Sequence, residues 1–206
     1  MSIQSSSYPV SVRGELTEPP GRGWWLLKWL LGIPHYFILL FLWIAFIFVS
    51  LIAFFAILFT ARYPESLFKF NVGVLRWSWR VGFYSYSALG TDKYPPFSLS
   101  PDPDYPADLD IPYPEKLSRG LVLIKWWLLA IPHYIVLAFF QGGNQGGGMT
   151  FILAIFGAIA TLFTGAYPAD IFKLVIGMNR WSLRVAAYVS LMCDEYPPFR
   201  LWDEQS

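Results

Sequence analysis

The chain has little charge and a single cysteine. Asp, Glu, Lys and Arg make up 14% of its 206 residues, and the formal net charge is +1. A nearly neutral chain has no basic field that would attract nucleic acid, so nucleic-acid binding is excluded. Because Cys193 is alone, it forms no internal disulfide and offers neither a metal cluster nor a redox pair.

The signatures of common soluble active sites are absent too. The sequence has no phosphate-binding glycine loop followed by Lys-Ser/Thr, no HExxH, no CxxC pair and no Gly-x-Ser-x-Gly elbow. The stretch QGGNQGGG (141–148) contains no lysine and follows an apolar run, which indicates a turn. We therefore predict a protein that is not an enzyme, with no catalytic residue, cofactor or metal site.

Apolar and aromatic residues are abundant instead. Hydrophobic residues account for 55% and aromatic residues for 19% of the chain, with ten Trp among them. Soluble domains are roughly 45–50% apolar, and Trp favours the bilayer interface. Residues 1–20 contain no apolar run, so we expect no cleaved secretion signal. The composition predicts an all-α integral membrane protein.

Most of the distinctive segments occur twice, once in each half of the chain. The pairs are RGWWLLKW (22–29) with RGLVLIKW (119–126), WLLGIPHY (29–36) with WLLAIPHY (127–134), LFTARYPESLFKFNVGVLRWSWRV (58–81) with LFTGAYPADIFKLVIGMNRWSLRV (162–185), and DKYPPFSL (92–99) with DEYPPFRL (194–201). Self-similarity of this kind is the signature of an internal repeat. We predict a first repeat over 1–100 and a second over 101–206.

The long apolar run in the first repeat must bend to fit a membrane. Residues 24–61 would form a straight helix about 57 Å long, against roughly 30 Å of hydrocarbon. In the second repeat, the Gly-rich segment 141–148 predicts a hairpin turn at a membrane surface. By analogy we predict a hairpin at 42–47. The alternative is a surface helix over 24–32, broken before Pro34, followed by one long tilted helix.

Each repeat also carries a third, more polar segment, at 67–89 and 171–191. Arginines at bilayer mid-depth are expensive, whereas an interfacial helix keeps them at the headgroups. We therefore predict about four transmembrane helices and two amphipathic interfacial helices. An even number of spans in each repeat would make the two copies parallel.

Together the repeated segments form one string of motifs: Trp-Leu-Leu-x-Ile-Pro-His, Leu-Phe-Thr-x-x-Tyr-Pro, Gly-x-x-Arg-Trp-Ser-x-Arg-Val and Asp-x-Tyr-Pro-Pro-Phe. This string resembles a bacterial integral-membrane family catalogued as a domain of unknown function (DUF4389), present here in two tandem copies. The departures from the string are small: the first copy has TEPPGRG (17–23) where the second has the fuller PYPEKLSRG (112–120). The resemblance implies a multi-pass protein of the bacterial cytoplasmic (inner) membrane, and it brings no established activity.

The only two histidines, His35 and His133, are a symmetric polar pair. The structural interpretation is that each follows a proline and donates to a carbonyl that the proline leaves without a donor. Two alternatives stay open, in which the pair ligates a haem iron or responds to protonation. We favour the structural role.

A second candidate set combines arginines with the tryptophans beside them. Its members are Arg76, Arg80, Arg180, Arg184, Trp77 and Trp181. These residues are predicted to contact anionic lipid headgroups or a partner protein. The alternative is internal pairing with Asp92, Asp194 or loop carboxylates, because the guanidinium fork suits either role.

The sequence favours a non-enzymatic accessory or scaffold protein that contacts membrane lipids, and possible partners are a larger membrane complex or a second copy of itself. One alternative is a small transporter or lipid-handling protein with a path between the repeats. Another is a bis-histidine haem protein that transfers electrons.

Overall fold

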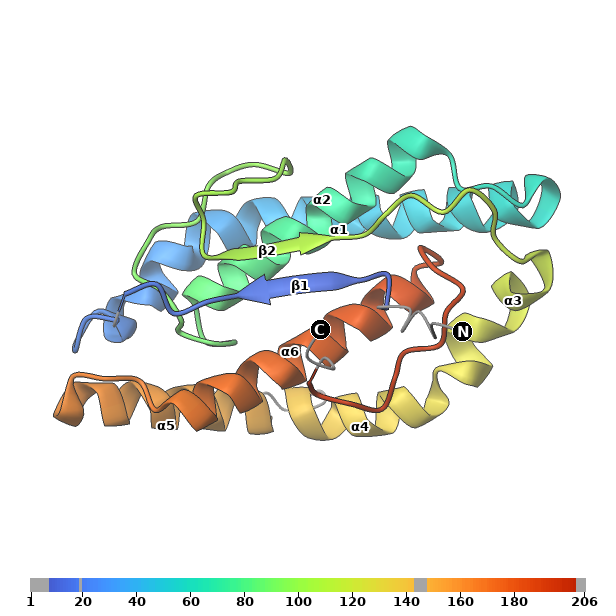
Figure 1. Ribbon diagram of the computed structural model, residues 1–206. Coiled ribbons are helices and arrows are strands. Elements are labelled where there is room, and N and C mark those ends of the chain that lie inside the picture. The colour runs from blue at the N-terminus through green and yellow to red at the C-terminus, as the bar shows by residue number, and fades with distance from the viewer. Residues whose placement is uncertain (1–7, 19, 143–147, 203–206) are drawn as a thin grey trace, which may run out of the picture.

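The computed structural model describes residues 8–18, 20–142 and 148–202 (Figure 1). In the view of Figure 1, α1 and α2 cross in the upper half and α4 and α5 run along the bottom, with the strands and α6 between them. The elements in chain order are β1 (Ser11–Gly14), α1 (Trp25–Thr60), α2 (Glu65–Tyr84), β2 (Ala107–Asp110), α3 (Arg119–Ile124), the π-helical turn η1 (Lys125–Leu129), α4 (Ile131–Gln141), α5 (Met149–Thr164) and α6 (Ala169–Val189). The fold is mostly helical, as predicted.

Helix α1 is one continuous helix of 36 residues. It passes through Pro34 and ends at Ala61, which adopts a left-handed φ of 58°. The predicted hairpin at 42–47 is therefore wrong, and so is the alternative break before Pro34. An interior proline costs a helix about 3 kcal/mol because it removes a hydrogen bond and crowds a carbonyl. Near this proline, the Tyr94 hydroxyl donates to the carbonyl of Leu31 at 3.0 Å.

The second repeat follows an equivalent path in several pieces. The segment from Lys125 to His133 is one residue longer than that from Lys28 to His35. The π-helical turn η1 accommodates the extra residue. The helix then bends by 45° between η1 and α4. As a result, the lysine and the histidine of the second repeat reach partners equivalent to those of the first.

Helices α4 and α5 lie end to end and run in the same direction (Figure 1). Trp181 of α6 donates to His133 of α4, whereas Met178, further back along α6, accepts a bond from Thr150 at the start of α5. The later part of α6 thus contacts α4, and the earlier part contacts α5, so α4 and α5 run in the same direction along α6. The predicted hairpin between these helices is wrong, because α5 continues in the direction of α4.

The Gly-rich insertion begins and ends at nearly the same point. A Cβ atom added at Gly148 would overlap the backbone of Gln141 and Gly142, so the end of α4 touches the start of α5. Residues 143–147 of the predicted turn lie outside the described residues. The insertion therefore interrupts a helical path without reversing it.

The two long helical paths are antiparallel. The backbone N–H of Leu117, just before α3, donates to the carbonyl of Ala61 at the end of α1. At the other end, Phe151 of α5 and Tyr36 of α1 line one cavity. The prediction of parallel copies is wrong, because each repeat contributes one long path and not an even pair of spans.

The outer helices expose an unusually large amount of apolar surface for a water-soluble protein. In α1 only 17% of the most apolar window is buried, and Phe37, Ile47 and Phe59 are 64%, 64% and 72% exposed. In contrast, α2 is buried over most of its length, and Arg80 within it is fully enclosed. The prediction that α2 and α6 are interfacial amphipathic helices is therefore wrong, because they form the centre of the molecule.

The linker between the repeats forms a strand that the sequence did not predict. Strand β2 pairs antiparallel with β1, and Val12 lies opposite Leu109. The strands lie between α2 and α6 (Figure 1), where the Trp79 indole donates to the carbonyl of Arg13 at 2.7 Å. The chain on both sides of the predicted boundary at residue 100 thus packs on the first repeat.

The described residues supply one helix that is long and apolar enough to cross a membrane, α1. A second candidate exists if the bent pair formed by α3–η1 and α4 counts as a single span, while α5 is apolar but shorter. Such helices give limited support for a membrane protein, and the described helices do not support four spans or a multi-pass arrangement.

Candidate functional site

The repeated motifs converge on one aromatic cluster in each repeat, which we call the histidine cage. In the first repeat His35 stacks on Phe97, with ring centroids 4.0 Å apart and planes at 13°, and Tyr94 lies 4.8 Å away. The cages consist of His35, Trp77, Tyr94 and Phe97 in the first repeat and of His133, Trp181, Tyr196 and Phe199 in the second. The Tyr-Pro-Pro-Phe segments thus deliver their rings to the histidines.

A tryptophan fixes the tautomer of each histidine. Trp77 Nε1 donates to Nδ1 of His35 at 3.0 Å, and Trp181 Nε1 makes the same bond to His133. An Nδ1 atom that accepts a hydrogen bond carries no proton, so the neutral ring carries its proton on Nε2. Both histidines are fully buried. The two tryptophans, predicted to contact lipid or a partner, instead hold the histidines.

The expected bond between each histidine and a proline-disturbed carbonyl is not the one observed. The tyrosine of each cage donates to a nearby helix carbonyl instead: Tyr94 bonds to that of Leu31, and Tyr196 bonds to that of Leu129 at 3.1 Å. Both carbonyls lie three residues before a proline. In the structure His35 and His133 each accept a hydrogen bond from a tryptophan and stack on a phenylalanine.

A buried ion pair lies beside each cage. Lys28 Nζ is 2.8 Å from an oxygen of Asp92, and Lys125 Nζ is 2.9 Å from an oxygen of Asp194. Both lysines are buried, and each also donates to a backbone carbonyl, that of Thr91 for Lys28. The second oxygen of each aspartate accepts a backbone N–H from the segment that precedes the long helix. Each ion pair therefore ties both ends of a repeat together.

Sequence reasoning missed these ion pairs. It considered Asp92 and Asp194 as partners for arginines, whereas the structure pairs them with lysines of the apolar helices. A signal was present, because a charged residue within an apolar run needs a partner. Each repeat has one lysine in its apolar run and one aspartate in its Asp-x-Tyr-Pro-Pro-Phe motif.

In the second ion pair, the two partners are expected to differ in how much stability is lost when each is replaced. Lys125 is fully buried, whereas the Asp194 side chain is 26% exposed. Asp194→Asn leaves an enclosed ammonium without its counter-charge, so we expect it to lower the free energy of unfolding by about 3 kcal/mol. Lys125→Met leaves a carboxylate that water can reach and should cost about 1–2 kcal/mol. Thermal unfolding in detergent would check this order, and equal losses would contradict it.

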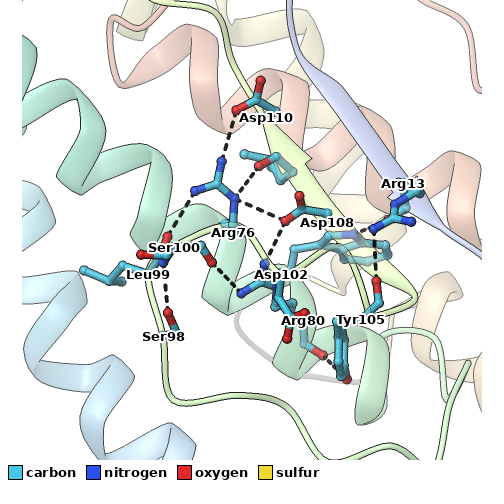
Figure 2. A network of polar contacts seen from close by, with 12 residues as sticks. Arg13, Arg76, Arg80, Ser98, Leu99, Ser100, Asp102, Tyr105, Asp108 and Asp110 are labelled. Carbon is cyan, nitrogen blue, oxygen red and sulfur yellow. Dashed lines mark hydrogen bonds and ion pairs between the residues drawn. The ribbon is translucent and has the colours of Figure 1, made fainter.

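The arginines of α2 form a separate cluster with the linker, which we call the arginine network (Figure 2). Arg80 Nη2 is 3.0 Å from an Asp108 oxygen, and Arg76 bridges Asp108 and Asp110 at 3.1 and 3.0 Å. Burial lowers the pKa of Arg80, and the Asp108 carboxylate opposes that shift. Internal pairing with loop carboxylates, one of the two expected roles, is the arrangement observed here.

The same arginines hold the chain that follows the Tyr-Pro-Pro-Phe segment. Arg76 donates to the carbonyl of Leu99 at 3.0 Å, and Arg80 donates to that of Ser100 at 2.9 Å (Figure 2). A Cβ atom at Gly73 would lie 2.7 Å from the Leu99 side chain, so glycine permits this close approach. Since Arg76 and Arg80 are buried, they do not form the exposed stripe expected to meet headgroups.

The arginines of α6 contact the N-terminal strand region. Arg180 donates to the carbonyl of Val12 at 3.5 Å, and the Arg184 guanidinium lies over the Tyr8 ring at 5.3 Å. Arg184 is buried and Arg180 is half-buried. The second pair of arginines thus faces the interior of the molecule, at the junction between the repeats.

The geometry of the cages is unfavourable for a shared haem. A neutral histidine that ligates iron through Nε2 needs its proton on Nδ1, and the tryptophan already donates to that atom. Each histidine is also enclosed by rings of its own repeat. Among the described residues, no three or more His, Cys, Asp or Glu side chains gather as a metal-ligand set.

Burial raises the pKa of Cys193 to about 11, which leaves a weak nucleophile.

Two cavities lie where the repeats meet along one side of α1. The larger, of about 590 Å³, is bounded by α1, the C-terminal part of α2, and the adjoining ends of α4 and α5. The smaller, of about 230 Å³, lies between α1 and α6. Trp43 lines both, so the two cavities adjoin at its indole ring.

Comparison with known proteins yields one family. The model described as "Domain of unknown function (DUF4389)" matches residues 23–98 and 122–200. Each match contains one histidine cage and one lysine–aspartate pair. The chain matches none of the curated proteins and none of the solved structures with which it was compared.

Proposed function

Because the chain belongs to the DUF4389 family in both of its halves, we propose that it is a non-enzymatic membrane scaffold built from two copies of one rigid unit. In each copy a long apolar helical path faces lipid. The histidine cage and the lysine–aspartate pair fasten that path to the central helix. The membrane of a bacterial cell is the proposed location.

The exposed apolar surface of both helical paths carries this proposal. Phe139 and Phe163 on the second helical path are 62% and 78% exposed, like the outer face of α1. Soluble monomers rarely expose contiguous apolar patches above a few hundred Å², whereas lipid favours such a surface. The buried ionic groups, in turn, are bonded to one another and to backbone carbonyls, which suits a framework more than a reaction centre.

Membrane extraction tests the proposal. We expect the protein to stay in the membrane pellet after an alkaline carbonate wash. Replacing Ile47 and Phe48, which are 64% and 63% exposed, with lysine should move most of it out of the pellet, since each charge costs about 2.5–3.5 kcal/mol within a bilayer. The control is Glu115→Lys in the exposed linker, which should behave as wild type. Release of the wild-type protein by the wash would refute the proposal.

The cavities at the repeat junction favour a second candidate function, lipid handling. Ligand sites commonly occupy clefts of about 300–1,000 Å³ at interfaces between structural units, and the larger cavity has about this size. It opens beside exposed apolar helices, where a lipid can enter from the bilayer. This candidate needs the same membrane location as the scaffold.

A further inference from the structure

We infer that the two adjoining cavities form one binding groove for a single lipid with an uncharged, hydrogen-bonding head. The groove follows α1 from Tyr36 to Ser50, a length of about 21 Å along a helix. Such a length suits a long acyl chain lying beside the helix. This inference rests on the proposed membrane location and adds a ligand class to it.

One end of the groove carries the polar groups. The larger cavity is lined by Ser78, Ser85, Ser87, Gln141 and Thr150, among apolar and aromatic walls. Hydroxyl and carboxamide groups both donate and accept hydrogen bonds, so they match hydroxyl or ester groups on a ligand. This end is the place for the head of the lipid.

The other end is apolar. The smaller cavity is lined by Trp43, Phe46, Ile47, Ala186 and Val189, with Ser50 and Ser190 as its hydroxyl groups. Trp43 stands between the two ends, where its Nε1 donates to Ser78 Oγ at 3.1 Å and its ring lies 4.7 Å from that of Phe46. The indole thus presents a polar edge to one cavity and an apolar ring to the other.

The charge of the lining selects the head group. The residues that line the two cavities include no Asp, Glu, Lys or Arg. Placing a charged head there would remove it from water without a counter-ion, which is strongly unfavourable. A monoacylglycerol-like molecule avoids that cost. Membranes offer such uncharged heads in several lipids, and the shared chemistry is a hydroxyl or ester group on an apolar chain.

Photocrosslinking in detergent tests the inference without any variant. The probes are two copies of one photoreactive acyl chain, ending either in a glycerol ester or in a sulfate. We expect the glycerol ester to label peptides spanning 36–50 and 186–190, and to label them at least about tenfold more than the sulfate does. Excess unlabelled monoacylglycerol should compete. Equal labelling by both probes, or labelling spread evenly over the outer face of α1, would overturn the inference.

Variants that fill the groove add an independent readout. Gly82 lines the polar cavity and Ala186 the apolar one, so Gly82→Leu and Ala186→Leu should each reduce glycerol-ester labelling at least about tenfold. Ala138→Leu, on the exposed face of α4 and outside both linings, is the matched control. Undiminished labelling in folded filled variants would refute the groove. Failure of the groove leaves the carbonate result unchanged, so the two proposals fail separately.

Discussion

Replacing Arg80 with methionine is expected to lower the free energy of unfolding by about 3–5 kcal/mol, the usual cost of removing one partner from a buried ion pair. The Arg80 side chain is fully buried and holds Asp108, whose side chain is 21% exposed. The substitution also leaves the carbonyl of Ser100 without its donor. Chemical denaturation in detergent, followed by far-UV circular dichroism, would measure the loss.

The exposed pair between Lys69 and Glu65 provides the control for this measurement. These residues lie one turn apart on the same helix, and their side chains are 72% and 61% exposed. Lys69→Met should therefore change stability by less than about 1 kcal/mol. If Arg80→Met cost no more than Lys69→Met, the arginine network would not contribute to holding the linker on α2.

The contribution of the arginine network to stability depends on the strand that carries its carboxylates. Asp108 and Asp110 lie on β2, which is held in turn by pairing with β1. Arg13 of β1 donates to the carbonyl of Tyr105 (Figure 2), and the Tyr105 hydroxyl donates to the carbonyl of Lys93 at 3.2 Å. Loss of Arg80 should thus loosen the N-terminal strand as well as the linker, since both depend on the same sheet.

Local sequence pattern predicted the helical class and the duplication, but not the paths of the helices. The apolar run of the first repeat exceeds the hydrocarbon thickness, which suggested a hairpin at 42–47. The structure keeps α1 continuous through Pro34, and the hydroxyl of Tyr94, sixty residues beyond Pro34 in the sequence, donates to the carbonyl of Leu31 near that proline. Spacing within the run carries no information on such a distant contact.

The local sequence pattern also could not predict that α2 and α6 lie at the centre of the molecule. An arginine stripe on a helix indicates exposure when its partners are unknown. Here the carboxylates that allow Arg76 and Arg80 to be buried come from the linker strand, about 30 residues away in sequence. A long-range pairing of this kind decides whether such a helix lies at the surface or at the centre.

The candidate site was predictable in some of its members but not in their roles. The sequence repeats the histidine, the tryptophan (Trp77 and Trp181) and the Tyr-Pro-Pro-Phe segment in both halves. This repetition pointed to the residues of the histidine cages. Only the fold shows that the indoles donate to the imidazoles. The lysines went unnoticed because each stands alone in an apolar run, although that isolation is the reason each needs its aspartate.

The histidine cages lead to the second large expected effect. Replacing His35 with leucine should lower the free energy of unfolding by about 2–4 kcal/mol, since it leaves the buried indole N–H of Trp77 without an acceptor and removes the stack on Phe97. His35→Asn should cost about 1–2 kcal/mol less, because its side-chain oxygen can accept the same bond. The same order is expected at His133, where Trp181 is the donor.

A tryptophan substitution decides between this role and a simple loss of volume. Trp77→Phe removes the donor while keeping an aromatic ring, so combining it with His35→Leu should cost less than the sum of the two single losses by about 1 kcal/mol or more. Thermal and chemical unfolding of the four proteins would give this coupling energy. A coupling near zero, with leucine and asparagine equally costly, would mean that the histidine acts only by filling space. A coupling of the expected size would explain why Pro-His-Tyr occurs in both repeats: each copy needs an acceptor beside its own tryptophan.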